Sequence, residues 1–211
     1  MNNRPNVLFI VTDDQRFDTI HALGNDEIIT PNLDRLTKMG VSFTNAHIAG
    51  GTCGAVCMPS RAMILTGRNP FGLQELGGDI PEDHTTMPEH FKNAGYETIG
   101  LGKWHNGCQG YARSFTQGAK IFFGGMWDHW NVPTSRFDPY GNYDNVINFT
   151  IDFYNSNKTQ KIHCDEFSPG KHSSELLTDS AIELIKENSG KEKPFFMYLA
   201  YLAPHDPRTM P

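Results

Sequence analysis

The stretch Asn6-Val-Leu-Phe-Ile-Val-Thr-Asp-Asp14 decides the fold, because a continuous apolar run ends there at two adjacent carboxylates. Such a run is typical of a strand that is buried on both faces, as in a parallel sheet covered by helices. Ligands of such sheets bind at the carboxyl ends of the strands, which is where Asp13 and Asp14 would lie. The stretch therefore predicts an α/β fold with a functional edge beside these two side chains.

Helix and strand signals alternate along the rest of the chain and support this fold class. Prolines in first turns, terminal glycines and one capping box mark the helices, whereas short apolar runs mark the strands. We expect a largely parallel or mixed central sheet with helices on both faces. Helices are predicted over residues 31–39, 59–67, 86–95 and 174–186, and strands from residue 41, over 96–101 and over 195–202.

Two parts of the chain do not follow the alternation. The segment from about 107 to 170 is polar, aromatic and rich in turns, and we expect it to be a surface insertion. After the last predicted strand the chain runs in a loop to Pro211, with no closing element. We therefore expect residues 1–211 to be the N-terminal portion of a larger domain.

Composition excludes several classes of protein. The chain has 211 residues, with 18 Lys and Arg against 24 Asp and Glu, and no basic cluster, which argues against a nucleic-acid partner. No apolar run approaches the roughly 18 residues of a membrane span, and the N-terminus carries no signal-peptide pattern. Four cysteines are too few for a disulfide scaffold. The composition is that of a globular domain with a sizeable core.

Polar side chains capable of chemistry follow three predicted strands and begin one predicted helix. Carboxylates can hold a hard cation, whereas basic side chains and a helix N-terminus can hold an anion. Together they suit transfer of a charged tetrahedral group such as phosphoryl or sulfuryl. Each alone has an ordinary structural explanation, as a turn, a solvated edge or a buried thiol. The candidates are Asp13, Asp14, Lys103, His105, His205 and the group from Cys57 to Arg61.

Cys57-Met-Pro-Ser-Arg61, followed by a helix and Thr-Gly, resembles the signature of the formylglycine-dependent sulfatases. Further stretches are similar to motifs of that family and occur in the family's order. The resemblance implies an alkaline-phosphatase-like fold, of which this chain holds the N-terminal part. These stretches are Pro5 to Asp14, Thr30 to Leu36, Gly102-Lys-Trp-His105 and Pro204-His-Asp-Pro207.

The resemblance also implies roles for single residues. Cys57 would be oxidised to formylglycine by a maturation enzyme, and its hydrate would be the nucleophile. Asp13 and Asp14, with the modified Cys57, would hold a divalent cation, usually calcium. Calcium prefers oxygen ligands, which fits the two carboxylates. Arg61 would hold the formylglycine.

Three further side chains would contact the reacting group. The resemblance implies that Lys103 and His105 contact the sulfate or the aldehyde hydrate, and that His205 contacts the sulfate or the leaving oxygen. A geminal diol suits this chemistry, because one hydroxyl can attack sulfur and expel the alcohol. The second hydroxyl can then lose its proton, so that the aldehyde re-forms and sulfate leaves.

The substrate would be an organic sulfate ester. The aromatic stretch from Phe122 to Trp130 suggests a sulfated sugar, with Trp127 and His129 contacting it; packing of the insertion onto the core is the alternative. The resemblance favours a periplasmic, secreted or lysosomal protein. Members usually carry more metal ligands, a further lysine and a C-terminal subdomain past the His205 loop. We therefore expect the isolated chain to be inactive and to bind calcium weakly.

Two other functions stay open. An alkaline-phosphatase-like phosphoesterase would use an unmodified Ser or Thr and two zinc ions, against which Cys57 argues. A catalytically silent domain that binds sulfated glycans would keep an unmodified Cys57 and bind without turnover.

Overall fold

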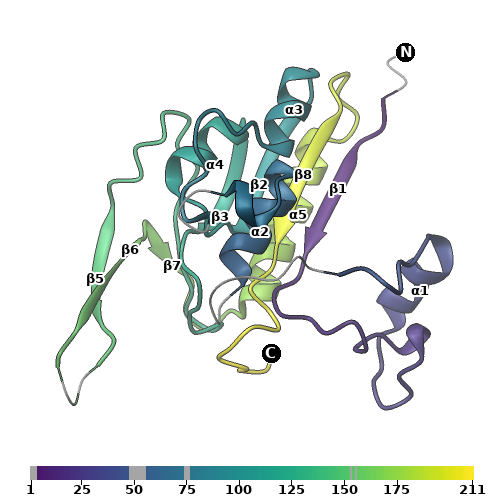
Figure 1. The fold of residues 1–211 in the computed structure, drawn as a ribbon, viewed down its shortest axis with the longest axis horizontal. Helices are drawn as coiled ribbons and strands as arrows, with labels where there is room; N and C mark the ends of the chain where they lie inside the picture. The colour runs from purple at the N-terminus through teal and green to yellow at the C-terminus, as the bar shows by residue number, and fades with distance from the viewer. Residues whose placement is uncertain (1–3, 48–55, 74–76, 153, 155) are drawn as a thin grey trace.

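A four-stranded sheet forms the centre of the computed structural model, which describes residues 4–47, 56–73, 77–152, 154 and 156–211 (Figure 1). Its strand order is β1-β8-β2-β3, and every neighbouring pair runs parallel. The predicted parallel α/β fold is therefore confirmed. The strands are β1 (Val7–Val11), β2 (Glu97–Lys103), β3 (Gln117–Phe122) and β8 (Phe195–Ala200).

Helices cover both faces of this sheet, as expected (Figure 1). Alternate side chains of β8 point to opposite faces and join two separate core clusters. Phe196 and Tyr198 pack with the side of α2, α3 and α4, whereas Met197 and Leu199 pack with α5. The helices are α2 (Cys57–Thr66), α3 (Met87–Asn93), α4 (Cys108–Ser114) and α5 (Ser173–Asn188).

The predicted helix ends are confirmed by their caps. Thr86 and Glu89 form the capping box that begins α3, and Gly67 ends α2 in the left-handed region with φ of 68°. α2 begins at Cys57, two residues before Pro59, which keeps the proline in the first turn. The helix boundary therefore places Cys57 at the N-terminus of α2.

The strand predicted from residue 41 is wrong. The helix before it, α1 (Pro31–Met39), forms as predicted, but residues 41–47 contain a turn and no strand, and Val41 and Phe43 are 84% and 83% exposed. An alternating pattern makes a strand only where a neighbouring strand takes its hydrogen bonds. α1 packs with the short helix η1 (His21–Leu23) in a lobe beside the sheet (Figure 1).

The expected insertion over 107–170 is only partly on the surface. Its first part forms α4 and β3, and Tyr111, Phe115 and Phe122 are among the largest fully buried side chains. α4 has seven residues, which is too short for a clear helical period. The rest forms two small antiparallel sheets, of which one is a projecting hairpin (Figure 1). These strands are β4 (Pro133–Thr134), β5 (Val146–Thr150), β6 (Thr159–His163) and β7 (Glu166–Phe167).

β1 is buried on one face only, against the expectation for its apolar run. Val7, Phe9 and Val11 pack on the core, whereas Leu8 and Ile10 are 47% and 49% exposed. β1 is the edge strand of the described sheet, and α5 packs on β2, β3 and β8. The helix that buries the second face of β8 therefore does not extend over β1.

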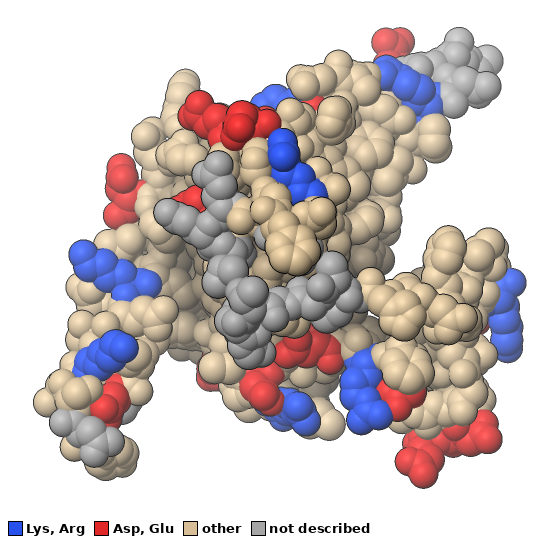
Figure 2. Space-filling view, in the orientation of Figure 1, with Lys and Arg blue, Asp and Glu red and all other residues tan. Residues whose placement is uncertain are grey.

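Charged side chains of both signs are mixed on the surface. On the face shown in Figure 2, Lys and Arg side chains are scattered among acidic ones and form no continuous basic patch. No helix in the described ranges has both the length and the apolar character needed to cross a membrane.

Candidate active site

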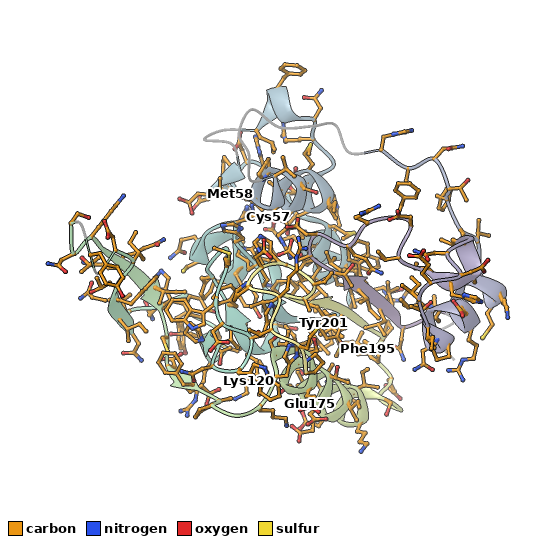
Figure 3. All side chains as sticks on the ribbon, turned by 90° about the horizontal axis from the view of Figure 1, so that it is seen from below. Cys57, Met58, Lys120, Glu175, Phe195 and Tyr201 are labelled. Atoms are coloured by element: carbon orange, nitrogen blue, oxygen red, sulfur yellow. The ribbon has the colours of Figure 1, made fainter. Side chains whose placement is uncertain are left out.

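The predicted site residues lie along the carboxyl edge of the sheet. This edge is seen from below in Figure 3, where Cys57 lies near the middle of the view. Parallel strands end at one edge, so loops that are distant in sequence meet there. The residues brought together are Asp13 and Asp14 after β1, Lys103 and His105 at the end of β2, His205 after β8, and Cys57 and Arg61 on α2.

A buried ion cluster joins β1, β2 and α2. Lys103 Nζ donates a hydrogen bond to Oδ2 of Asp13, and a guanidinium nitrogen of Arg61 lies 3.5 Å from the same oxygen. All three residues are at most 4% exposed. Buried charges persist where they are paired, and here two cations share one carboxylate. The cluster therefore keeps one formal positive charge that Asp13 does not neutralise.

Further hydrogen bonds fix Arg61. Its Nη1 donates to the carbonyl oxygen of Lys103 at 2.7 Å and to the hydroxyl of Tyr198 at 3.1 Å. Burial raises the pKa of Tyr198, while Arg61 acts to lower it, so the phenol stays protonated at neutral pH. Arg61 is four residues after Cys57 on α2, so the two side chains share one helix face.

Gly102 allows the end of β2 to approach β8 closely. Its φ is +80°, and a Cβ atom at this position would lie 1.9 Å from the carbonyl oxygen of Ala200. No other residue fits without moving the backbone. The β2–β3 register shifts between Leu101 and Gly102. The glycine of the Gly-Lys-Trp-His motif thus lets Lys103 lie directly behind the site.

His105 lies beyond β2, which ends at Lys103, so the two residues do not alternate on one strand as expected. Its φ is 68°, a left-handed conformation that is uncommon outside glycine. Burial, reinforced by the charges of Lys103 and Arg61, lowers the pKa of His105 to about 4. No described residue makes a hydrogen bond with its buried Nδ1. His105 is therefore neutral at physiological pH.

Asp14 and His205 lie on the more open side of the site. Nε2 of His205 is 3.5 Å from Oδ2 of Asp14, whose side chain is 56% exposed. Nδ1 of His205 lies 2.9 Å from the carbonyl oxygen of Asp206. Since a carbonyl only accepts, Nδ1 carries a proton, and Nε2 is the nitrogen that faces Asp14.

Two cavities meet at Cys57, which is 8% exposed. One of about 260 Å³ contains Asp13, Asp14, Gln15 and Arg61 in its lining, and one of about 400 Å³ is lined in part by His105 and His205. The Cys57 thiol is free, as are those of Cys108 and Cys164, whereas Cys53 lies outside the described residues. Cys57 is thus accessible from a carboxylate side and from a histidine side.

The smaller cavity fits a hard cation in part. Asp13 and Asp14 supply carboxylate oxygens and Gln15 an amide oxygen on the lining that includes Cys57. Calcium takes about six to eight oxygen ligands, more than two carboxylates provide. Among the described residues, no group of three or more His, Cys, Asp or Glu side chains is arranged to hold a metal. Water or other oxygen atoms would have to complete the shell.

His129 lines a further cavity, of about 420 Å³, beside Asp14 and His205, so its contact with a sugar stays a prediction. His129 is buried, with Nδ1 2.7 Å from the hydroxyl of Ser173 and Nε2 2.9 Å from the carbonyl oxygen of His205. Trp127 lines the larger of the two cavities at Cys57, and its ring is 4.5 Å from that of Phe149. The roles of His129 and Tyr198 depend on contacts between distant segments, so no local sequence signal reveals them.

Comparisons with known proteins identify the family of this chain. The Sulfatase family model matches residues 5–211. The chain is 32% identical over 204 residues to N-acetylglucosamine-6-O-sulfatase of Bacteroides thetaiotaomicron, covering 96% of this chain and 31% of that protein. It is 30% identical over 223 residues to human N-acetylgalactosamine-6-sulfatase, covering 96% of this chain and 40% of the relative. The chain thus spans between about a third and two fifths of these curated relatives.

Solved structures show the same fold. A protein in complex with its substrate D-glucosamine-2-N,6-O-disulfate superposes with a TM-score of 0.70 at 27% identity, covering 97% of this chain and 35% of that one. A second, in complex with a neocarrahexaose, gives a TM-score of 0.69 at 26% identity, covering 99% of this chain and 47% of the other. With the family model matched along nearly the whole sequence, this chain belongs to the sulfatase family.

Proposed function

We propose that the protein hydrolyses an organic sulfate ester, with formylglycine derived from Cys57 as its nucleophile. The observation that carries the proposal is the position of Cys57, at the N-terminus of α2 and between two cavities. Behind it lies the buried cluster of Asp13, Lys103 and Arg61, with its uncompensated positive charge. A sulfate group would enter a site that already attracts an anion.

When present, formylglycine hydrate at position 57 supplies one hydroxyl to attack sulfur and a second whose deprotonation releases sulfate. Lys103 and Arg61 would stabilise the charge on the sulfuryl oxygens in the transition state. Their hydrogen bonds to Asp13 and Tyr198 hold them in place before the substrate binds. Such preorganised charges need no reorganisation during the reaction.

The two histidines would have different roles. His105, neutral because its pKa is lowered to about 4, would accept a hydrogen bond from the aldehyde hydrate or contact the sulfate. Nε2 of His205 faces the carboxylate of Asp14, 3.5 Å away, on the more open side of the site. His205 would donate a proton to the leaving oxygen.

A divalent cation, calcium in our proposal, would be held by Asp13, Asp14 and the modified residue 57, and would supply a Lewis acid for a sulfate oxygen. The sulfated-sugar names of the relatives support a sugar leaving group. The proposal includes a maturation enzyme that oxidises Cys57. It also places the protein in the periplasm, outside the cell or in the lysosome, as the family resemblance suggests.

The test is a mass spectrum of the peptide across Cys57, on protein from its native source. Conversion of the thiol to an aldehyde is the expected result, together with hydrolysis of 4-nitrophenyl sulfate in preference to 4-nitrophenyl phosphate. An intact thiol with glycan binding and no turnover would favour a silent binding domain. Preference for the phosphate ester would favour a phosphoesterase.

A further inference from the structure

The larger cavity at Cys57 has a second wall that the proposed chemistry does not use. The hairpin of β5 and β6 lies on one side of Cys57, and the lobe of α1 on the other (Figure 3). Phe149, Ile151, Gln160 and Ile162 of the hairpin line the cavity opposite His105 and His205. A group bonded to a sulfate at residue 57 would have room toward this hairpin and toward the cavity of about 420 Å³ beside Asp14 and His205.

Strand register determines which side chains the hairpin presents. Phe149 pairs with Gln160, and the next pair, Asn148 with Lys161, points to the opposite face because side chains alternate along a strand. The cavity-facing set is apolar except for Gln160. The face of the hairpin that lines the cavity thus carries one amide among apolar side chains, whereas the opposite face carries Asn148 and Lys161.

The wall is aromatic and partly fixed before any ligand binds. Nε1 of Trp127 donates to the carbonyl oxygen of Asn131 at 2.9 Å, and the Trp127 ring meets Phe149 edge to face at 76°. These contacts hold both rings at the side of the cavity. Flat apolar surfaces of this kind suit the C–H face of a pyranose ring.

Gln160 supplies the polar counterpart. Its side chain is exposed at the rim of the cavity and makes no hydrogen bond with any described residue, although an amide can donate two and accept two. An amide that borders a cavity without a partner is free to bind the hydroxyl groups of a ligand. Aromatic surface with a few placed polar groups is the usual composition of a small-molecule site.

We propose that the β5–β6 hairpin is the leaving-group wall of the site, and that Gln160 determines specificity by hydrogen bonding to a hydroxyl of a pyranose. This inference rests on the proposed sulfatase function and adds to it the wall that holds the leaving group and the residue that selects it. An aryl sulfate has the same sulfate group but no ring hydroxyls, so it bypasses Gln160.

The test compares two substrates in the complete gene product. Gln160→Leu keeps the size of the side chain and removes both hydrogen-bonding groups. We expect kcat/KM for N-acetylglucosamine 6-sulfate or N-acetylgalactosamine 6-sulfate to fall by roughly tenfold, mostly through KM, the loss of about one hydrogen bond. The kcat/KM for 4-nitrophenyl sulfate should stay within about twofold. Phe149→Ala should also affect the sugar ester more than the aryl ester.

The opposite face of the same hairpin provides matched controls. Asn148→Ala and Lys161→Gln change side chains beside Phe149 and Gln160 but outside the cavity, and should leave both substrates unaffected. A melting temperature for each variant identifies loss of folding, and Gln160→Glu offers a second variant of the same length.

Three outcomes would overturn the inference. Gln160→Leu could affect both substrates equally, or it could leave the sugar ester unaffected. The third outcome is a wild-type protein that hydrolyses the aryl sulfate but neither sugar sulfate. In each of these the aryl sulfate is still hydrolysed, so the proposed function survives. A wild-type protein that hydrolyses no sulfate ester would instead refute the proposed function, and the inference with it.

Discussion

Nε2 of His129 donates a hydrogen bond to the backbone carbonyl of His205, 2.9 Å away, across more than seventy residues of sequence. The second ring nitrogen lies 2.7 Å from the hydroxyl of Ser173, and the ring stacks on His172 at 5.2 Å. His172 in turn holds the carbonyl of Thr209 through Nε2, at 3.1 Å. The loop that carries His205 is therefore tied to the start of α5.

The hydrogen bond between His129 and the carbonyl of His205 predicts that His129 positions the His205 side chain. His129→Phe removes the donor and should lower kcat for 4-nitrophenyl sulfate by roughly tenfold, with a loss of about 1–3 kcal/mol of stability from unsatisfied buried groups. His129→Gln can place an amide nitrogen near the Nε2 position and should restore most of kcat. Steady-state kinetics and thermal melts measure both. Equal kcat in the Phe and Gln variants would show that the hydrogen bond has no catalytic effect.

The lowered pKa of His105 predicts a pH-dependent stability. The ordinary histidine pKa of about 6.5 applies to the unfolded chain, and about 4 applies to the folded one. Between these values the unfolded chain binds more protons, so stability is full above pH 6.5 and is lost as the pH falls toward 4, by up to about 3 kcal/mol. His105→Asn should flatten this part of the curve of melting temperature against pH. An unchanged slope would refute the assignment.

The pair of Asp13 and Lys103 predicts strong coupling. Lys103→Met leaves Asp13 with Arg61 as its remaining cation and should abolish turnover, at a stability cost of about 3 kcal/mol. Asp13→Asn alone leaves two buried cations without a carboxylate, whereas the double variant leaves only Arg61, so the loss in the double variant should be smaller than the sum of the single losses. Denaturant melts of the two single variants and the double variant give the coupling energy. Additive losses would contradict the shared ion cluster.

The nucleophile itself should contribute little to folding. Cys57→Ala removes one sulfur atom next to two cavities, so we expect turnover to vanish while the melting temperature changes by only a few degrees. Cys108→Ala serves as the control with a retained nucleophile. Its thiol, whose pKa is raised by burial to about 12, is far from reactive.

Calcium dependence should respond to Asp14. This side chain is more than half exposed, so Asp14→Asn should leave folding intact while raising the calcium concentration for half-maximal activity by roughly tenfold. Treatment with a chelator should abolish turnover, and added calcium should restore it. A protein whose turnover is indifferent to chelation would refute the proposed metal site.

The sequence predicts those parts of the fold that are determined by interactions between residues close together in the chain. The apolar run before Asp13, the capping box at Thr86 and the stop at Gly67 each act within a few residues. The placement of β8 between β1 and β2 depends on long-range pairing, which no local pattern encodes. α4 and β3 escaped prediction because they are short, although Tyr111 and Phe122 in them are fully buried.

In the site, too, local patterns predict some residues, whereas contacts between distant segments determine others. Motif residues such as Cys57 and Arg61 were found from their local pattern, because α2 brings them together within one turn. The predicted sugar contact of His129 leaves out its tie to the His205 loop, since the two hydrogen-bond partners of His129 come from α5 and from the loop after β8. Nothing near Tyr198 in sequence indicates that its hydroxyl accepts from Arg61.

The strand order also determines when the sheet can form during synthesis on the ribosome. β1 has β8 as its neighbour in the described sheet, so it stays unpaired until residues 195–200 leave the exit tunnel. At about 5–20 residues per second, the interval after Cys57 emerges lasts on the order of ten seconds. During that time the thiol is on an unassembled chain, whereas afterwards it is buried. An enzyme that oxidises Cys57 would thus meet its substrate as a nascent polypeptide, before β8 pairs with β1.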